Sequence, residues 1–457
     1  MTEMKSKLPV IVIGAGLSGT LLAIRMAQRG YEVVLFEKRP DMRKVDISAG
    51  RSINLALSNR GLKALRLIGL EREMLDLTIP MYGRMIHDTE GNTSLQSYSG
   101  RANHFIRSIS RGELNIRLLN KAESLDNVSI YFNSPCTHVD LRAGVVHYRD
   151  AQGREQEMTG QVIFGADGAG SALRNSMSRH SATLRFSFSQ KFLQHGYKEL
   201  TFPALEGGQH CIDKNALHIW PKGGYMLIAL PNLDGSFTVT LFLPFEGENS
   251  FDQLQTGAQV KRFFEEQFPD AVPLMPRLEE EFFEHPTGAL ATVKCYPWQV
   301  GGKTLLMGDA AHAVVPFYGQ GMNASFEDVT ILDQLMGDAF DGNWEQLFKR
   351  YQELRKPDAD AIGDMAEENY YEMRDKVKDD TFVIKRQLEL SLEQAFEDYH
   401  SKYALVTFKD DVPYHVAMQK GHCQDEYLMH FCKNLIEEYI DKIDLSVLHR
   451  QLKKYCR

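Results

Sequence analysis

The stretch from residue 9 to residue 37, PVIVIGAGLSGTLLAIRMAQRGYEVVLFE, constrains the fold more than any other part of this chain. Its unbroken apolar start is typical of a strand buried in a parallel sheet, and it leads into Gly14-x-Gly16-x-x-Gly19 and a helix. A second apolar strand then ends at Glu37. In this order, the glycines let the backbone approach a pyrophosphate at the helix N-terminus, and the acid accepts hydrogen bonds from ribose hydroxyls. The stretch therefore predicts one βαβ unit of a doubly wound sheet that binds the adenosine end of a dinucleotide.

Two more glycine-marked turns lie far from this unit. One is GADGAGS at residues 165–171, which on its own could equally be a strand end followed by a capped helix. The other is GDAAHAVVPFYGQGMNASFED at residues 308–328, which leads into a predicted helix from about residue 322. Because a dinucleotide is long, a turn distant from this unit must hold the end opposite the adenosine. His312 within this stretch is interpreted as structural.

The residues between about 195 and 245 follow a different pattern. ALHIWP, GYMLIALP and SFTVTLFLP alternate apolar and polar positions and are separated by Lys-Gly-Gly and Asn-Leu-Asp-Gly turns. We therefore expect an α/β protein with a Rossmann-like βαβ fold, an inserted antiparallel β-sheet domain for the substrate, and a C-terminal helical region. The expected boundaries are 1–78, 103–182 and 296–345 for the nucleotide-binding domain, 79–102 and 183–295 for the sheet domain, and 346–457 for the helical region.

Composition argues against several classes of protein. A net charge of −9 argues against a general nucleic-acid-binding protein. No run approaches the ~18 apolar residues that span a bilayer, and no signal peptide is evident, so we expect a cytoplasmic protein without a membrane span. The six cysteines have neither a Cys-x-x-Cys pair nor zinc-ligand spacing, which predicts reduced thiols and no metal site.

The C-terminal segment carries apolar residues at positions 428, 432, 435, 439 and 443. On a helix, this spacing makes a single apolar stripe. We interpret the segment as a helix packed on the body of the protein, with a helix lying on a membrane surface as the alternative.

The two later turns resemble the GADG and GDAAH segments of flavoprotein aromatic-ring hydroxylases. The resemblance implies bound FAD, with Asp309 on its ribityl chain and Asp167 near both the flavin and the nicotinamide cofactor. A helix N-terminus beside the anionic reduced ring would contribute about 0.3–2 kcal/mol. A single nucleotide-binding unit fits this family, whose NADPH docks only transiently. The residues expected to contact FAD are Gly14, Gly16, Leu17, Gly19, Glu37, Lys38, Arg39, Arg51, Arg111, Cys136, Asp167, Asp309, Gly321, Met322 and Asn323.

Longer strings are similar to the kynurenine 3-monooxygenase family. They include GRSINLALS from residue 50, YGRMIHD from 82, HGYKEL from 195, NALHIWP from 215 and ENYYEM from 368. The resemblance implies hydroxylation of L-kynurenine to 3-hydroxykynurenine in tryptophan catabolism, with FAD, NADPH and molecular oxygen, through a flavin hydroperoxide. It implies orientation and water exclusion in place of a catalytic acid, base, nucleophile or metal. A homodimer is compatible with it.

The same resemblance implies a substrate site with a polar end and an apolar end. Arg84 would bind the substrate carboxylate through its guanidinium fork, together with Tyr98 and Tyr403. The family usually has Ile-Pro-x before that last tyrosine, whereas this chain has Ser-Lys. Asn369 would serve the polar end, and it shares one helix face with Met365 and Met373. The apolar residues expected around the aromatic ring are Leu230, Phe242, Pro316, Phe317 and Met373.

Two alternatives remain open at this point. One is a related hydroxylase of another aromatic carboxylic acid, because an arginine and a tyrosine indicate a carboxylate but not kynurenine in particular. The other is a flavin-bound protein whose redox state controls partner binding. NADPH oxidation that depends on a small aromatic acid separates the second alternative from an enzyme.

Overall fold

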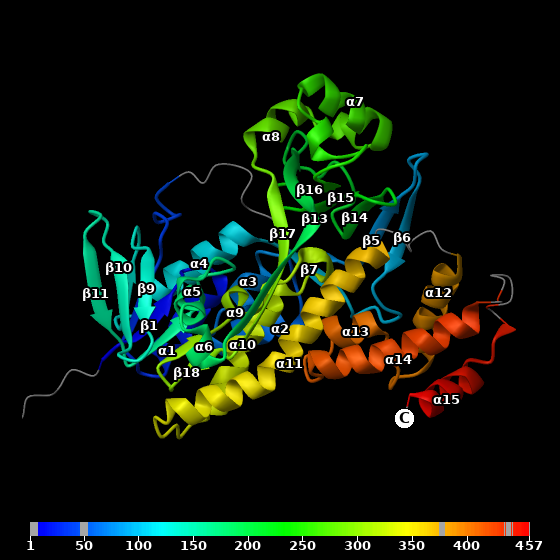
Figure 1. The fold of residues 1–457 in the computed structure, drawn as a ribbon. Helices are drawn as coiled ribbons and strands as arrows, with labels where there is room; N and C mark the ends of the chain where they lie inside the picture. Colours follow the sequence, from blue (N-terminus) through cyan, green and yellow to red (C-terminus); the bar gives the residue numbers. More distant parts are fainter. Residues whose placement is uncertain are drawn as a thin grey trace, which may run out of the picture.

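The computed structural model describes residues 8–45, 54–373, 380–433, 435, 440 and 442–456, and it places a nucleotide-binding sheet, a second large sheet and a helical region side by side (Figure 1). The nucleotide-binding sheet has six strands in the order β18-β19-β12-β1-β2-β8, and only the pairing of β18 with β19 is antiparallel. Its strands are β1 (Val10–Ile13), β2 (Val33–Phe36), β8 (Val128–Tyr131), β12 (Val162–Gly165), β18 (Gln299–Val300) and β19 (Thr304–Leu306).

The predicted βαβ unit forms the centre of this sheet. Helix α1 (Leu17–Gln28) connects β1 to β2, and all four residues of each strand are buried. Gly14 has a positive φ of 101°, and a Cβ there would lie 2.5 Å from the Ala166 carbonyl oxygen, so the turn requires glycine. A Cβ at Gly19 would lie 1.9 Å from the Gly14 carbonyl oxygen, so this glycine lets the helix pack closely on the turn.

A seven-stranded sheet confirms the predicted insertion. Its order is β17-β13-β16-β15-β14-β5-β6, and all pairings except β14 with β5 are antiparallel. Helices α7 (Gly257–Gln267) and α8 (Leu278–Glu284) lie against it at the top of Figure 1, over a core that includes Trp220, Phe237 and Phe264. The strands are β5 (Gly83–His87), β6 (Thr93–Ser97), β13 (Ser187–Phe202), β14 (Ala216–Pro221), β15 (Met226–Pro231), β16 (Phe237–Pro244) and β17 (Gly288–Tyr296).

Two small sheets complete the strands. One contains β3 (Asn54–Leu57), β7 (Ile106–Ser110) and β4 (Ile79–Met81), and the other contains β11 (Glu155–Thr159), β10 (Val145–Arg149) and β9 (Cys136–Asp140). The remaining short elements are α2 (Asn59–Leu67), α3 (Glu71–Leu75), α4 (Arg111–Glu123), α5 (Ala172–Ser178), α6 (Ser181–Leu184), α9 (Asp309–His312) and the 3-10 turns Phe251–Gln253, Val272–Leu274 and Pro316–Tyr318.

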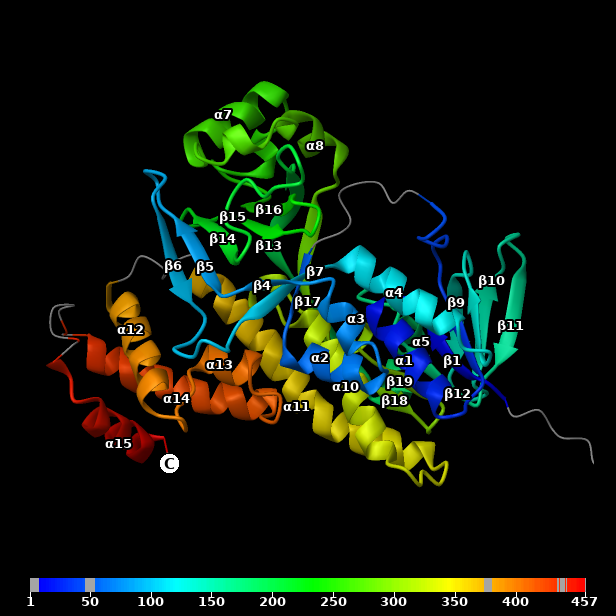
Figure 2. The same ribbon diagram turned by 180° about the vertical axis from the view of Figure 1, so that it is seen from behind.

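The chain beyond residue 320 is mostly helical, as expected. Helix α11 runs along the molecule beneath both sheets, and the last helices gather at one end (Figure 2). These helices are α10 (Gly321–Met336), α11 (Trp344–Tyr371), α12 (Asp380–Ala395), α13 (Lys402–Thr407), α14 (Tyr414–Cys432) and α15 (Leu445–Tyr455).

The C-terminal apolar stripe does not belong to one helix, which corrects the sequence expectation. Helix α14 ends at Cys432 and α15 begins at Leu445. Leu428, Cys432, Leu435 and Ile443 nevertheless pack in one cluster with residues of α12 and α15, while position 439 lies outside the described residues. The spacing of the apolar residues therefore predicted their burial correctly, but it did not predict the break between the two helices.

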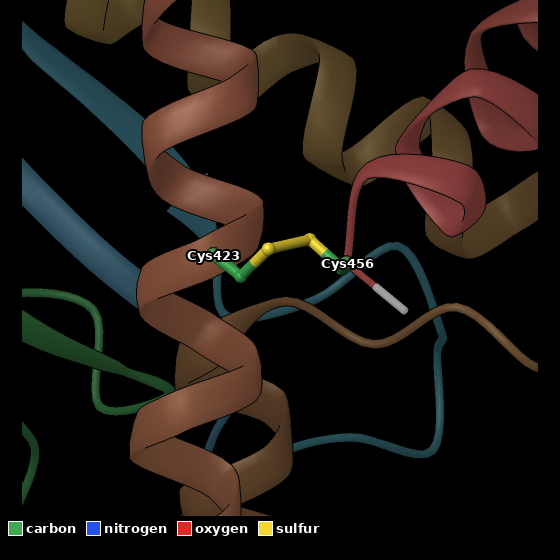
Figure 3. The surroundings of a disulfide bond; sticks show 2 residues. All are labelled: Cys423 and Cys456. Carbon is green, nitrogen blue, oxygen red and sulfur yellow. A yellow bond between two sulfur atoms is a disulfide. The ribbon is translucent and has the colours of Figure 1, made fainter.

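A disulfide joins α14 to the residue that follows α15, so the expectation that all cysteines are reduced thiols is wrong (Figure 3). Cys423 and Cys456 are 33 residues apart, and their Cα atoms lie 5.7 Å from each other. Because α15 packs alongside α14, the two sulfurs meet although their spacing in the sequence shows no known pairing pattern. Cys136, Cys211, Cys295 and Cys432 are free thiols.

The described residues contain neither a membrane-spanning helix nor a cluster of metal ligands. None of the helices in this part of the chain combines the length and apolar character that a bilayer span requires. Within the same residues, no group of three or more His, Cys, Asp or Glu side chains could hold a metal ion.

Candidate active site

A cavity of about 1020 Å³ is bordered by the nucleotide-binding sheet, the seven-stranded sheet and the start of α10. One end is the turn between β1 and α1, and the other end is formed by β14, β15 and β16. Typical small-ligand sites have roughly 300–1,000 Å³, so this cavity has room for a long cofactor together with a second small molecule.

The end at β1 has the features of an adenosine site. Glu37 is buried at the end of β2; its Oε2 accepts a hydrogen bond from the Ala15 backbone N–H (3.0 Å), and its Oε1 accepts from the Arg39 backbone N–H (3.0 Å) and Nε (2.8 Å). These bonds fix the carboxylate in the cavity wall, and a carboxylate has further lone pairs that can accept from ribose hydroxyls. A Cβ at Gly16, where α1 begins, would meet nothing within 4 Å, so the wall leaves open space beside the helix N-terminus.

The middle of the cavity contains a carboxylate and a guanidinium from separate elements. Asp309 begins α9, and its side chain is open to the cavity but lies deep in the protein. Burial raises the pKa of Asp309, and the charge of Arg111 at the start of α4 lowers it. Both side chains line the cavity, so this part of the wall offers an acceptor and a cation to a ligand that passes between them.

A buried network behind the wall fixes the backbone that carries Asp309. Asp328 on α10 is fully buried, and its Oδ2 accepts from the Gly308 backbone N–H (2.8 Å) and lies 2.6 Å from His312 Nε2. Its Oδ1 accepts from Arg355 Nε (2.9 Å). Burial alone would raise the pKa of Asp328, but His312 and Arg355 outweigh it and hold the pKa at about 2. His312 thus has a charged partner, and its burial outside the cavity wall agrees with the expected structural role.

The GADG turn closes another side of the cavity. Asp167 Oδ2 accepts from the Ala172 backbone N–H at the start of α5 (2.6 Å), whereas its buried Oδ1 has no hydrogen-bond partner among the described residues. Burial raises the pKa of Asp167. Burial and the charge of Asp167 also raise the pKa of the neighbouring Cys136 thiol to about 12, so this cysteine stays protonated at neutral pH.

The far end of the cavity is apolar. Phe317, in the turn before α10, lies with its ring centroid 4.9 Å from that of Phe242 on β16. Asn369 on α11 donates from Nδ2 to the Phe317 carbonyl oxygen (2.7 Å), which holds the turn in place. The other apolar side chains on this part of the wall are Leu217, Met226, Ile228, Leu230, Pro316 and Met373.

A small polar annex of about 50 Å³ adjoins the apolar end and shares Arg84, Tyr318 and Tyr403 with the main cavity. The Arg84 guanidinium carbon lies 5.1 Å from the ring centroid of Tyr403 and 5.9 Å from that of Tyr98. The buried Nε of Arg84 and the buried hydroxyl of Tyr98 have no hydrogen-bond partner among the described residues. Burial raises the pKa of Tyr98 well above its usual value, so its hydroxyl remains a donor.

Most residues singled out from the sequence meet at these two cavities. Leu17, Lys38, Arg39, Gly321 and Met322 line the main cavity with the FAD-site residues already described, while Asn369 and Tyr98 line the annex. Tyr403 lies on α13 with its ring stacked 5.3 Å from that of Tyr98, although the residues before it depart from the family pattern. Arg51 lies outside the described residues.

Three expected residues are not part of the cavity wall. Gly19 serves the packing of α1, and Met365 on α11 is buried in the core. Asn323 is fully buried; it accepts from the Ser58 backbone N–H (3.0 Å) and donates to the Ala56 and Gly319 carbonyl oxygens (2.8 and 2.9 Å). Its amide joins β3 to the turn before α10, so it positions the wall from behind.

Sequence reasoning missed several wall residues. Leu217, Met226 and Ile228 lie on predicted strands, and the alternation of those strands could have assigned them to the same face as Leu230 and Phe242. Tyr318 follows two predicted residues directly, and its ring stacks 5.6 Å from that of Tyr403. No sequence pattern indicated the charged residues just after α11 and on α12 and α13 that complete the annex.

Comparison with known proteins gives consistent matches over most of the chain. Residues 7–366 match the family described as FAD binding domain. A kynurenine 3-monooxygenase of Myxococcus xanthus is 50% identical over 418 residues, which cover 91% of this chain and 89% of that protein. The kynurenine 3-monooxygenase of Dictyostelium discoideum is 43% identical and covers 98% of both chains. That of Stenotrophomonas maltophilia is 42% identical over 96% of this chain and 95% of its own.

Solved structures match the fold at lower sequence identity. A tetrameric form of 2-methyl-3-hydroxypyridine-5-carboxylic acid oxygenase has a TM-score of 0.66 at 20% identity, covering 88% of this chain and 95% of that one. A Klebsiella pneumoniae HpxO variant complexed with FAD has a TM-score of 0.65 at 19% identity, covering 84% and 94% of the two chains. At these identities, the solved structures show only that this chain shares their fold.

Proposed function

Because this chain belongs to the kynurenine 3-monooxygenase family and to the FAD binding domain family, we propose that it hydroxylates L-kynurenine to 3-hydroxykynurenine, with NADPH and molecular oxygen as cosubstrates. Bound FAD supplies the redox chemistry by accepting electrons from NADPH and activating oxygen. One observation supports this substrate above all: an apolar pocket with room for an aromatic ring adjoins the annex, which contains the cationic side chain of Arg84.

The cavity supports an extended FAD along its length. We assign the adenosine to the end at Glu37, the pyrophosphate to the N-terminus of α1, and the ribityl chain to the stretch between Arg111 and Asp309. The open space at Gly16 and the unpartnered Asp167 Oδ1 fit this group, because each leaves room or an acceptor for a ligand at the wall. The N-terminus of α10 would then face the pyrimidine edge of the ring.

The chain's own residues orient the substrate. A guanidinium buried without a hydrogen bond at Nε is costly unless a ligand supplies one, and a carboxylate is the matching acceptor. Tyr98 and Tyr403 frame this position, and Phe242 with Phe317 would hold the aromatic ring. With the carboxylate and the ring both fixed, these residues would hold the substrate in one orientation, and the apolar wall would exclude water from the ring.

The experiment that tests the proposal is NADPH oxidation by the purified yellow protein, with and without L-kynurenine, followed by the mass of the product. Stimulation with a product one oxygen heavier supports the assignment. Stimulation that yields only hydrogen peroxide would show that kynurenine fits the site without being hydroxylated. If other aromatic carboxylic acids stimulate oxidation and kynurenine does not, the substrate is wrong; if none does, a redox-controlled binding protein replaces the enzyme.

A further inference from the structure

The part of the main cavity wall that β14, β15 and β16 form contains a single polar side chain. Every residue of these three strands is described, and among those that line the cavity Thr240 alone is polar. Because side chains alternate along a strand, Thr240 shares a face of β16 with Phe242, and its partner on β15 is Ile228. The strand residues that line the cavity are Leu217, Met226, Ile228, Leu230, Thr240 and Phe242.

The hydroxyl of Thr240 is buried without a hydrogen bond. Thr240 is fully buried, and its Oγ1 has no hydrogen-bond partner among the described residues. Glu199 lies opposite on β13 and is also buried, but the Thr240 hydroxyl does not bond to it. Thr238, two residues earlier on the same face, differs because its Oγ1 lies 3.2 Å from Asn232 Nδ2 and 3.4 Å from Asn54 Oδ1. An unpaired buried hydroxyl costs free energy, and a ligand that supplies the partner removes this cost.

The proposed substrate carries a group that matches this hydroxyl. The aromatic ring of L-kynurenine has an amino group beside the ketone, so one N–H of the amine donates to the ketone oxygen within the molecule. The other N–H would lie in the apolar pocket, where it requires an acceptor. A threonine hydroxyl has lone pairs that accept such a bond, and Thr240 is the acceptor that this part of the wall offers.

The place of the amine decides which ring carbon reacts. An amino group activates the ring carbons ortho and para to itself towards an electrophilic oxygen. In L-kynurenine, a half-turn of the ring about its bond to the ketone exchanges the places of the free ortho carbon and the para carbon. The apolar side chains contact the ring in either orientation, whereas a hydrogen bond to the amine forms in only one of them.

We propose that the hydroxyl of Thr240 accepts a hydrogen bond from the ring amine of the substrate and thereby selects the ortho carbon for hydroxylation. This inference rests on the proposed function, and it deepens it by assigning the choice of ring position to one side chain. Thr240 is a specificity residue, which holds the ring in one of two orientations and exchanges no proton with it. Without the hydroxyl, both orientations are populated, and the 5-hydroxy isomer forms beside 3-hydroxykynurenine.

A purely structural role for Thr240 predicts a different stability. If its side chain rotates so that the hydroxyl donates to Glu199 or to a main-chain carbonyl, Thr240→Val loses that bond, and the substrate-free holoenzyme unfolds at a lower denaturant concentration. If the hydroxyl serves a ligand, valine keeps the shape and removes an unpaired polar group. The midpoint of chemical denaturation should then be no lower than that of the unmodified protein.

The binding test compares two ligands on the oxidised holoenzyme, without turnover. L-kynurenine and its counterpart without the ring amine, 2-amino-4-oxo-4-phenylbutanoate, are titrated while the flavin absorbance reports binding. For Thr240→Val we expect the Kd of L-kynurenine to rise about 3- to 30-fold and the Kd of the counterpart to stay within about twofold.

The product test uses the same variant in turnover with L-kynurenine and NADPH. Chromatography separates the two isomers, and the ratio of 5-hydroxy to 3-hydroxy product should rise by about 3- to 30-fold, because the lost bond is the one that separates the orientations. Thr240→Ser keeps the hydroxyl and should keep the product ratio of the unmodified protein.

The matched control is Thr238→Val, the same change two residues earlier on β16. Thr238 is not among the described residues of either cavity wall, so its variant should lose stability and keep both Kd values and the product ratio. An equal rise of both Kd values in Thr240→Val would overturn the inference, because the side chain would then shape the pocket for any ring. An unchanged Kd for L-kynurenine, an unchanged product ratio or a lowered denaturation midpoint would also overturn it. If the unmodified holoenzyme neither binds nor hydroxylates L-kynurenine, the proposed function itself fails, which is a separate result.

Discussion

The two ends of the main cavity are built in opposite ways. At the end that we propose for FAD, called the FAD end below, the backbone dominates: the turn at Gly14, the open helix N-terminus at Gly16 and the strand end at Glu37 all come from 24 consecutive residues, 14 to 37. At the annex, side chains dominate, and Arg84, Tyr318 and Tyr403 come from a strand, a turn and a helix that are more than 300 residues apart at the extremes.

This difference follows from what each end must recognise. Main-chain N–H groups can bind a pyrophosphate, and one acidic side chain can bind a ribose, so the local conformation of a turn is sufficient to form such a site. A substrate with a charged head and an aromatic ring requires several side chains at fixed distances, which only tertiary packing supplies. We therefore expect changes at the FAD end to alter cofactor retention, and changes at the annex to alter substrate affinity while leaving the flavin in place.

The largest effect is expected for Asp328→Asn, which removes the buried charge shared by His312 and Arg355. Breaking a buried ion pair costs about 3–5 kcal/mol of folding free energy, and here the turn that carries Asp309 loses its anchor as well. Chemical denaturation should show the lost stability, and the purified variant should contain less FAD. Full stability with full flavin content would show that the network does not support the cofactor end.

Asp328 should also make the stability of the folded protein depend on pH, in a direction that its pKa determines. Its folded pKa of about 2 lies below the usual value of about 3.9, so its contribution is fully present above pH ~4 and is lost as the pH falls towards 2. Unfolding measured between pH 2 and 5 should therefore be less steeply pH-dependent in Asp328→Asn than in the unmodified protein.

A second effect of comparable size concerns the helices that support the annex. A disulfide that closes a loop of 33 residues stabilises a fold by roughly 3–4 kcal/mol, through the entropy of the unfolded chain. Cys456→Ser should lower the protection of α15 from amide hydrogen exchange by up to this amount and leave FAD content unchanged. Thiol titration of the unfolded, unreduced protein should find four reactive thiols, whereas six would contradict the disulfide.

Arg84→Ala tests the substrate end directly. The loss of a buried pair with the substrate carboxylate should raise the KM for L-kynurenine by the equivalent of roughly 2–4 kcal/mol. Flavin content should not change, because the FAD end is built from other residues. Arg84→Lys keeps the charge without the planar fork, so its KM should lie between that of the unmodified protein and that of Arg84→Ala. Unchanged kinetics in the alanine variant would remove Arg84 from the site.

Glu37→Ala is the counterpart at the FAD end. The expected loss is about 1.5–3 kcal/mol in FAD binding, since hydrogen bonds to a charged acceptor are lost. The ratio of flavin to protein absorbance after dialysis measures this loss. When the variant is saturated with FAD again, its Kd for L-kynurenine should be unchanged. A variant that stays fully flavinylated would contradict the ribose role.

The contrast between the two ends also explains how much the sequence could predict. The βαβ unit, the inserted sheet and the helical C-terminal half were predictable, because each has a local signature: a glycine spacing, an alternation, or a run of helical residues. The glycine spacing and the acid after the second strand are local signatures too, and they lead to residues that line one end of the cavity. Asn323 does not line the cavity although its motif neighbours Gly321 and Met322 do, because its side chain on α10 bonds to β3.

The annex was less predictable, because no local sequence pattern indicates which residues form it. Glu372 lies within ENYYEM, but it lines the annex together with Arg84, which lies 288 residues earlier in the chain. The pairing of Cys423 with Cys456 depends on the return of α15 along α14, which the apolar stripe did not reveal. Charge matching and disulfide pairing are properties of the folded chain, and only the structure supplies the neighbours that decide them.

Tyr403→Phe is expected to have the smallest effect, and it tests the tyrosine whose preceding residues depart from the family pattern. The ring of phenylalanine keeps the stacking on Tyr98 and Tyr318, so only the hydroxyl is lost. Because Arg84 and Tyr98 would still hold the substrate carboxylate, we expect a loss of only about 0.5–1.5 kcal/mol, the range of an ordinary hydrogen bond, which corresponds to an increase of roughly 2- to 12-fold in the Kd for L-kynurenine. Titration of the oxidised holoenzyme measures it. An unchanged Kd would mean that Tyr403 shapes the annex through its ring alone, and the carboxylate would then depend on Arg84 and Tyr98.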